Sequence, residues 1–189
     1  MAALTPMMQQ YMEVKNQYKD CILFYRLGDF YEMFFDDALT ASKVLEITLT
    51  GRDCGQPERA PMCGVPYHAC DVYLNKLIEN GFKVAICEQV EDPKLAKGIV
   101  KREVIRVVTP GTNMSNAILD ETRNNYLMSI FENDGAFGIS LVDITTGEFK
   151  TARVPSLSKL TDEINKYSPA EIIGNHSFMN CDLDFVYLR

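Results

Sequence analysis

Residues 21–34 read CILFYRLGDFYEMF, and the expected fold of the first half of the chain is built around them. Cys21–Leu27 is an apolar and aromatic run with Arg26 as its one charged residue, which is typical of a strand buried on both faces. Gly28-Asp29 then predicts a turn, because glycine and aspartate favour chain reversal. Phe30–Phe34 continues as a second extended segment, so the stretch predicts two strands joined by a short turn.

The flanking residues predict helices and strands in alternation. Thr5-Pro6 is typical of a helix start, because proline is tolerated at the first helical position. Glycine and proline punctuate residues 51–66, which therefore predict a loop. Helices are expected from Pro6 to about Lys19, from Asp36 to about Leu45 and over Asp71–Asn80, and strands at Ile47–Leu49, Lys83–Val90 and Lys101–Val108. This order indicates an α/β domain with a mixed sheet.

A second domain is expected after Pro110, where the apolar periodicity is lost. Residues 111–123 are mostly small and polar and predict a linker between a first domain at 1–110 and a second at 124–189. The second domain predicts strands at 126–131, 136–142 and 148–154, then a helix at 157–167 and a strand at 170–173. This is the opening of an RNase H-like fold. The fold needs more elements than this segment supplies, so an incomplete domain is expected.

Charge gives little support for a nucleic-acid role. The net charge is −7; residues 1–110 carry 13 Lys+Arg against 15 Asp+Glu, and residues 111–189 carry 6 against 11. The basic run is Lys94, Lys97, Lys101, Arg102 and Arg106, and such runs are usually solvated faces. The sequence lacks a membrane-spanning stretch and a basic signal region, and its six cysteines lack a metal-binding spacing. A cytoplasmic protein with reduced thiols is expected.

Six segments, in the same order and at similar spacing, resemble the MutS family of DNA mismatch repair proteins. Phe30–Glu32 matches the family's Phe-x-Glu mismatch-recognition motif, a triplet that carries weight only together with the other segments. The segments are Arg26–Phe34, Ile47–Arg52, Pro61–Ala69, Val84–Gln89, Val107–Thr112 and Leu141–Phe149. The resemblance implies a mixed-sheet mismatch-recognition domain, followed by part of the family's RNase H-like connector domain.

The resemblance implies that Phe30 and Glu32 recognise mispaired or looped-out bases in duplex DNA. Residues two apart on an extended segment face the same way, so both project together while Tyr31 faces the other side. An apolar ring wedges between base steps most easily where pairing is faulty. The carboxylate accepts a hydrogen bond from the displaced base and repels phosphates of intact duplex. Residue type alone favours a simpler interpretation, with Phe30 in the core and Glu32 a solvated charge.

Other candidate DNA contacts are Asp29, Arg52 and Met62, which lie in the resembling segments, and the basic residues Lys101, Arg102 and Arg106. The resemblance implies that Arg52 and Met62 face the duplex. The three basic residues are candidates because cations neutralise phosphates.

Two other classes of function stay open. A metal-dependent nuclease of RNase H-like fold would use Asp143 and Glu148, because two-metal sites use clustered carboxylates. The strand that opens at Tyr126 offers Asn124 and Asn125 in place of carboxylates. A protein-interaction module is favoured by the acidic second half, and an exposed apolar patch there would support it.

No catalytic site, metal or cofactor is expected in this chain. A phosphate-binding Gly-x-x-x-x-Gly-Lys-Ser/Thr segment does not occur in it, so ATP hydrolysis is not expected here. The resemblance implies that ATP and Mg²⁺ bind in a distant carboxy-terminal domain of the full-length protein. It also implies a homodimer and a MutL-type partner. The chain alone is therefore expected to bind mismatched duplex weakly.

The predicted domain division can be tested by limited proteolysis. We expect the first cuts within residues 111–123 or near the carboxy terminus, because linkers and chain ends are the preferred sites of nicking. Mass spectrometry of a time course identifies the first fragments. Early cleavage between Cys21 and Leu45, with residues 111–123 intact, would contradict the division.

Overall fold

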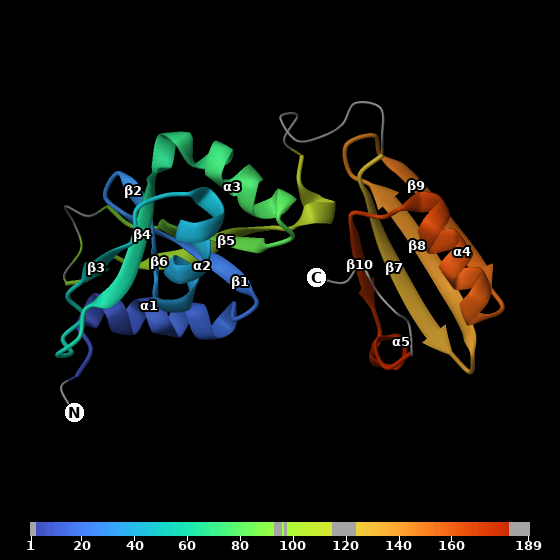
Figure 1. Ribbon diagram of the computed structural model, residues 1–189, viewed down its shortest axis with the longest axis horizontal. Coiled ribbons are helices and arrows are strands. Elements are labelled where there is room, and N and C mark those ends of the chain that lie inside the picture. Colours follow the sequence, from blue (N-terminus) through green and yellow to red (C-terminus); the bar gives the residue numbers. More distant parts are fainter. Residues whose placement is uncertain (1–2, 93–95, 97, 115–123, 182–189) are drawn as a thin grey trace. The chain divides into compact units, whose positions relative to one another are not determined.

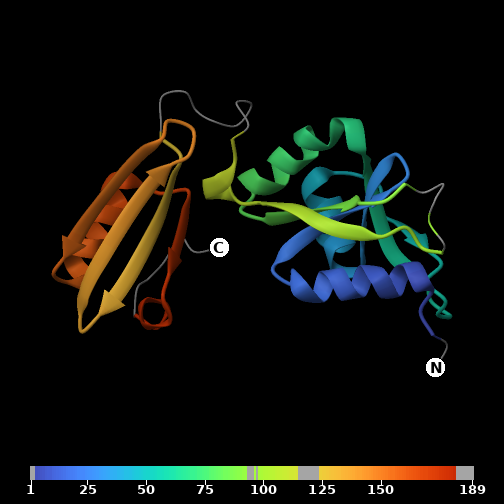
Figure 2. The ribbon, with the colours of Figure 1, turned by 180° about the vertical axis from the view of Figure 1, so that it is seen from behind.

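The structure, a computed structural model, describes residues 3–92, 96, 98–114 and 124–181. It divides into two compact units, Met1–Val108 and Thr109–Arg189, each with its own sheet (Figures 1 and 2). Both units combine helices with a mixed sheet, which confirms the predicted fold class. Every helix formed by the described residues is too short or too polar to cross a membrane.

Unit 1 is built on a six-stranded mixed sheet. Its strands are β1 (Cys21–Leu27), β2 (Phe30–Phe34), β3 (Thr50–Arg52), β4 (Ala60–Pro66), β5 (Lys83–Gln89) and β6 (Arg102–Val108). They lie in the order β3-β4-β2-β1-β5-β6, with β1 antiparallel to β2 and parallel to β5. Leu27 pairs directly with Phe30, so the predicted two-strand unit is a hairpin with a two-residue turn.

Helices cover both faces of this sheet (Figure 1). They are α1 (Pro6–Gln17), α2 (Phe35–Leu45) and α3 (Cys70–Glu79), with a 3₁₀ turn, η1 (Tyr67–Ala69), before α3. Ile22 and Phe24 of β1 pack with α2 and α3, whereas Leu23 and Tyr25 pack with α1. Residues 21–25 of β1 are therefore buried on both faces of the sheet, which explains why they form a continuous apolar run.

Two boundaries in the first 50 residues differ from the sequence-based expectation. Helix α1 ends at Gln17, two residues before the predicted Lys19. The strand predicted at Ile47–Leu49 is wrong, because β3 begins only at Thr50. The alternation of apolar and threonine residues there is a local pattern, and the chain leaves α2 through a left-handed residue at Glu46 instead.

The predicted loop over residues 51–66 is also wrong, because it contains most of β3 and the whole of β4. Strand β4 pairs with both β2 and β3, so it lies inside the sheet. Its prolines, Pro61 and Pro66, stand near its two ends, where the loss of a ladder hydrogen bond is tolerated. Cys63 and Val65 are buried at alternate positions, which is the strand signal that the prolines obscured.

Unit 2 is built on a four-stranded sheet in the order β10-β7-β8-β9. Its elements are β7 (Tyr126–Asn133), β8 (Ala136–Asp143), β9 (Glu148–Val154), α4 (Leu157–Tyr167), β10 (Glu171–Gly174) and α5 (His176–Met179). Strands β7 to β9 are antiparallel neighbours, and β10 returns beside β7 in parallel. This is the predicted opening of an RNase H-like fold. Helix α5 is an element that the sequence analysis missed.

The segment that joins the units belongs partly to unit 2. Its first residues form the 3₁₀ turn η2 (Pro110–Thr112). The Gly111 amide donates to the Glu171 carboxylate at 3.1 Å, and the Asn125 side-chain amide donates to the Pro110 carbonyl at 3.0 Å. The sequence-based linker at 111–123 stays a prediction, since residues 115–123 lie outside the described part.

A buried polar network ties α1, β1 and α2 together. The Asp37 carboxylate accepts from the Leu23 amide at 3.0 Å and from the Tyr11 hydroxyl at 3.3 Å, and it pairs with Lys15 Nζ at 2.9 Å. Burial of the Tyr11 ring and the nearby Asp37 charge raise the pKa of Tyr11 far above its ordinary value, so the hydroxyl stays a donor. The network leaves the carboxylate fully satisfied, as a buried charge requires.

We expect Asp37→Ala to lower the free energy of unfolding of unit 1 by about 3 kcal/mol, because breaking a buried ion pair strands its partners. Native-state hydrogen exchange of the β1 amides measures this change. The control is Asp36→Ala, which removes the exposed neighbour and should change stability by less than about 0.5 kcal/mol. Equal effects of both variants would show that the network contributes nothing.

Candidate nucleic-acid interface

Phe30 stands at the start of β2 with its side chain turned away from the core. Its exposed fraction is 47%, whereas Tyr31 is 5% exposed and packs against α2 and α3. Phe34, at the other end of β2, packs with α1. Phe30, Glu32 and Phe34 therefore share the sheet face that carries α1, but Phe30 lies beyond the part that α1 buries. The interpretation of Phe30 as a core aromatic does not fit this exposure.

The turn before Phe30 is tight because of Gly28. Gly28 has a φ of +58°, a left-handed conformation that two-residue hairpin turns use and that side chains disfavour. Asp29, the other turn residue, is exposed, and its carbonyl accepts from the Tyr67 amide at 2.9 Å. The candidate contact Asp29 therefore lies beside Phe30, at the tip of the hairpin.

Arg26 braces this hairpin from the face opposite Phe30. Its Nε donates to the Gly28 carbonyl, its guanidinium lies 3.7 Å from the centroid of the Tyr67 ring, and its Nη1 is 3.3 Å from Glu88 Oε1. Glu88 also accepts from the Tyr31 hydroxyl. Burial and this hydrogen bond raise the pKa of Tyr31 well above its ordinary value. Four side chains from β1, β2, β5 and η1 thus fix the turn.

Glu32 is not a freely solvated charge. Its side chain is 15% exposed, and Oε2 pairs with Nη1 of Arg52, whose side chain is 37% exposed. The two residues come from β2 and β3, which are separated by β4. Gly64 of β4 pairs with Glu32, and a Cβ added there would lie 3.4 Å from Glu32 Cγ. A Cβ at position 64 would thus touch the Glu32 side chain, which shows that Glu32 lies against the backbone of β4.

Met62 is the remaining candidate from the resembling segments. It lies on β4, where it pairs with Phe34 of β2 and with Thr50 of β3. Its side chain is partly buried on the sheet face that carries α1. The structure thus places four of the candidates on the neighbouring strands β2, β4 and β3 and the fifth, Asp29, in the turn before β2.

The basic candidates lie on β6 or beside it, three strands from β2 in the sheet order. Lys101 is exposed and pairs with Glu103 at 2.6 Å, and Arg106 is exposed. Arg102 is 8% exposed; it donates to the Arg26 carbonyl at 2.7 Å and to Gln10 Oε1 at 3.0 Å. The guanidinium of Arg102 is thus used inside unit 1, and we remove it from the candidate contacts. Lys94 and Lys97 lie outside the described residues.

Asp143 and Glu148, the acids of the nuclease alternative, have structural partners. Asp143 is buried and accepts from the Thr145 hydroxyl at 2.6 Å and from the Asn125 amide at 3.1 Å. Burial raises the pKa of Asp143, but these hydrogen bonds outweigh it and hold the pKa below its ordinary value. Glu148 pairs with Lys150 at 2.7 Å. Within the described ranges, no group of three or more His, Cys, Asp or Glu side chains is arranged to hold a metal.

Cysteine chemistry offers no alternative site in the described part of the chain. All six cysteines are free. Burial raises the pKa of Cys21 and of Cys63 to about 11 and that of Cys87 to about 12, which keeps these thiols protonated and unreactive.

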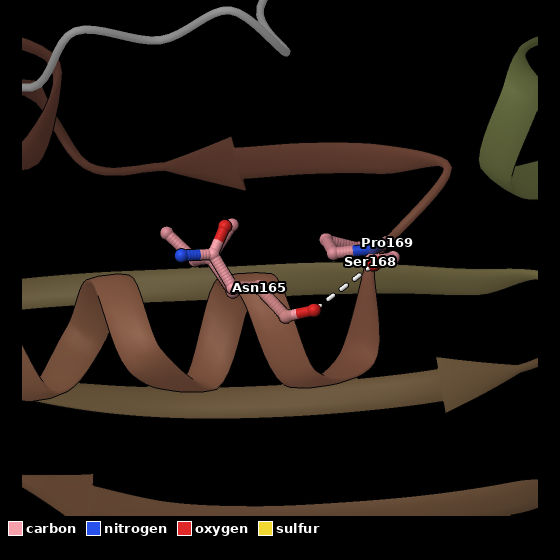
Figure 3. A pocket seen from close by; sticks show the side chains of 4 residues that line it. Asn165, Ser168 and Pro169 are labelled. Carbon is pink, nitrogen blue, oxygen red and sulfur yellow. Dashed lines mark hydrogen bonds between the residues drawn. The ribbon is translucent and has the colours of Figure 1, made fainter.

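Of the hollows found beside α4, the smallest is too small for an organic ligand. It has a volume of about 40 Å³ and is lined by Ile164, Asn165, Ser168 and Pro169 (Figure 3). The Ser168 hydroxyl donates to the Asn165 carbonyl at 3.0 Å across its rim. Such a space admits water but not a nucleotide.

Unit 2 exposes apolar side chains on the sheet face opposite α4. Phe131, Phe149 and Ile173 are exposed there, while their neighbours Ile130 and Ile172 pack with α4. The interaction-module alternative therefore retains a defined surface, in contrast to the nuclease alternative.

These features define a two-unit mixed α/β protein that presents an aromatic ring and a carboxylate on a braced hairpin. The family model for MutS domain I matches residues 5–117, and that for MutS domain II matches residues 125–182. The chain belongs to the MutS family.

Curated relatives agree with this assignment, and each carries the name DNA mismatch repair protein MutS. The relative from Lachnoclostridium phytofermentans is 70% identical over 189 residues, which are all of this chain and 20% of the relative. Those from Acetivibrio thermocellus and Ruminiclostridium cellulolyticum are 64% and 63% identical over 95% and 96% of this chain, and each is covered to 21%. The chain thus spans about a fifth of the length of these relatives.

The brace around Arg26 was missed from sequence, and its role can be tested directly. We expect Arg26→Ala to mobilise the turn, because it removes the stacking on Tyr67 and the bond to the Gly28 carbonyl. The measurement is the amide order parameter of Asp29 and Phe30, which should fall from a rigid value near 0.85 toward about 0.6. Arg59→Ala, at an exposed arginine just before β4, is the control. An unchanged turn in Arg26→Ala would assign Arg26 to overall stability alone.

Proposed function

We propose that this chain is the part of a mismatch repair protein that recognises mispaired or looped-out bases in duplex DNA, with Phe30 as the wedge and Glu32 as its polar partner. The observation that carries the proposal is the 47% exposure of Phe30 on a hairpin fixed by four side chains. A large ring costs free energy when it is left in water. Its exposure on a rigid support therefore supports a role in contact with a partner.

The chemistry of a faulty base pair fits this arrangement. A ring that enters the stack pays the cost of unstacking, which is lowest where pairing is already lost. A rigid hairpin lowers the cost of insertion further, because little side-chain or backbone freedom is lost on binding. Asp29 and Met62 lie near enough to Phe30 and Phe34 to contact the same stretch of duplex, and Lys101 and Arg106 are exposed for phosphates.

Glu32 contributes selectivity in this proposal. Its carboxylate accepts a hydrogen bond from the displaced base, which an intact pair does not offer. The same charge repels phosphates of an intact duplex, so it weakens binding where no mismatch is present.

We extend the proposal to the whole protein by family membership. The remaining four fifths would supply ATP hydrolysis with bound Mg²⁺, a homodimer contact and a MutL-type partner, all in the cytoplasm. This chain has no phosphate-binding loop, so its own contribution is recognition without catalysis.

The test uses a hybrid protein in which this chain replaces the matching fifth of the 70%-identical relative. Phe30→Ala should weaken binding to a mismatched duplex ten- to a hundredfold, because base–aromatic stacking contributes about 1–3 kcal/mol. Fluorescence anisotropy titrations with mismatched and perfect duplexes give the ratio of affinities. Phe131→Ala removes a phenylalanine of unit 2 that is 61% exposed, and it should leave the ratio unchanged. An unchanged ratio in Phe30→Ala would refute the proposed function.

Glu32→Ala should act differently from Phe30→Ala in the same titrations. We expect the ratio of mismatched to perfect affinity to fall mainly because the perfect duplex binds more tightly once the repulsive charge is gone. The gain on perfect duplex should shrink at higher ionic strength, because salt screens the repulsion. Glu58→Ala, at an exposed carboxylate of the same unit, is the control. Weaker binding of both duplexes in Glu32→Ala would show that Glu32 supports the fold instead.

A further inference from the structure

The Glu32 carboxylate is already paired in this structure, with an arginine that comes from β3. Arg52, its ion-pair partner, stands opposite Ala60 on β4, whereas Phe30 stands opposite Pro66. Six residues of strand separate those two positions, which is roughly 20 Å along β4. The backbone of Arg52 therefore lies toward the end of β4 opposite the one that pairs with Phe30, and its side chain extends from there to Glu32.

The backbone of β4 allows the Glu32 side chain to pair with Arg52. Gly64 faces Glu32 directly, and any side chain at Gly64 would begin 3.4 Å from Glu32 Cγ. A larger residue would obstruct the path from β2 to Arg52 on β3. The pair also leaves Glu32 only 15% exposed, so Arg52 shields the carboxylate and weakens, without removing, the repulsion between its charge and DNA phosphates.

We propose that Arg52 is a specificity-determining residue that holds Glu32 in reserve: the ion pair persists in the free protein and on intact duplex, and it opens only when a displaced base offers a hydrogen-bond donor. The proposal rests on the proposed function, since it concerns how the same two residues are deployed. A displaced base can therefore bond to Glu32 only if that bond is worth more than the ion pair with Arg52.

The relative strengths of the two interactions make such a threshold workable. The pair is partly exposed through Arg52, and ion pairs of this kind contribute little, so they open readily. A hydrogen bond from a base to a charged group inside a closed interface contributes more. A displaced base therefore outcompetes Arg52, whereas intact duplex offers nothing in exchange.

Arg52 also has donors to spare. A guanidinium carries five N–H groups, and only Nη1 is engaged with Glu32. The exposed part of Arg52 can meet a phosphate in either state. That contact adds equally to mismatched and perfect binding and cancels in their ratio. The opening of the pair is the step by which Arg52 affects the two complexes differently.

The test measures that ratio in the hybrid protein for Arg52→Gln, with Arg59→Gln as the matched loss of one exposed cation. Arg52→Gln should raise the ratio of mismatched to perfect affinity roughly two- to fivefold, which is the cost of opening a partly exposed pair. Arg59→Gln should weaken both duplexes alike and leave the ratio unchanged. Arg52→Lys should restore a ratio near that of the parent, because the ammonium can pair with Glu32.

A background without the carboxylate decides whether Arg52 acts through Glu32. In Glu32→Gln, the further change Arg52→Gln should not alter the ratio, since no charge remains to be held. The inference is overturned if Arg52→Gln leaves the ratio at the parent value, lowers it, or raises it equally in both backgrounds.

Phe30→Ala, measured alongside, separates this failure from failure of the proposed function. If Phe30→Ala reduces the ratio while Arg52→Gln does not raise it, recognition stands and the role of Arg52 falls. If Phe30→Ala leaves the ratio unchanged, the proposed function fails, and this inference fails with it.

Discussion

Burial of β1 on both faces is the constraint on which unit 1 depends. Ile22 and Phe24 require cover from α2 and α3, and Leu23 and Tyr25 require cover from α1. A strand of seven residues that is apolar on both sides is stable only inside a sheet between two layers of helix. The turn that follows the carboxyl end of β1 needs no such cover from helices. The exposed tip at Phe30 is thus the point where the core stops.

The division between predictable and unpredictable features follows the range of the interactions. Strand β1 and the turn at Gly28 are local: an apolar run and a glycine with positive φ specify them without help from distant residues. Strand β4 was missed because its place in the sheet depends on pairing with β2 and β3, while its prolines argued locally for a loop. Its prolines stand at the strand ends, a tolerance that only the sheet reveals.

The candidate site shows the same division. Alternation along β2 placed Phe30 and Glu32 on one face, and the burial of Tyr31 on the other face agrees with that. The partners of these residues are tertiary. Arg26 and Glu88 are 62 positions apart, and Arg102 reaches the carbonyl of Arg26 from 76 positions away. Arg102 was predicted as a surface cation because the sequence of a basic run does not indicate which of its side chains the sheet buries.

The side chains on one face of β2 hold the core together, and those near the start of its other face are exposed or partly exposed. Tyr31 and Met33 belong to the core, while Phe30 is exposed and Glu32 is partly buried on the other face of the same short strand. Selection can therefore alter the chemistry of the probe at the outward positions without disturbing the packing that holds it. A lineage could exchange the ring or the carboxylate and keep its scaffold intact. In a five-residue strand, the side chains of one face can vary independently of those on the other face that keep the unit folded.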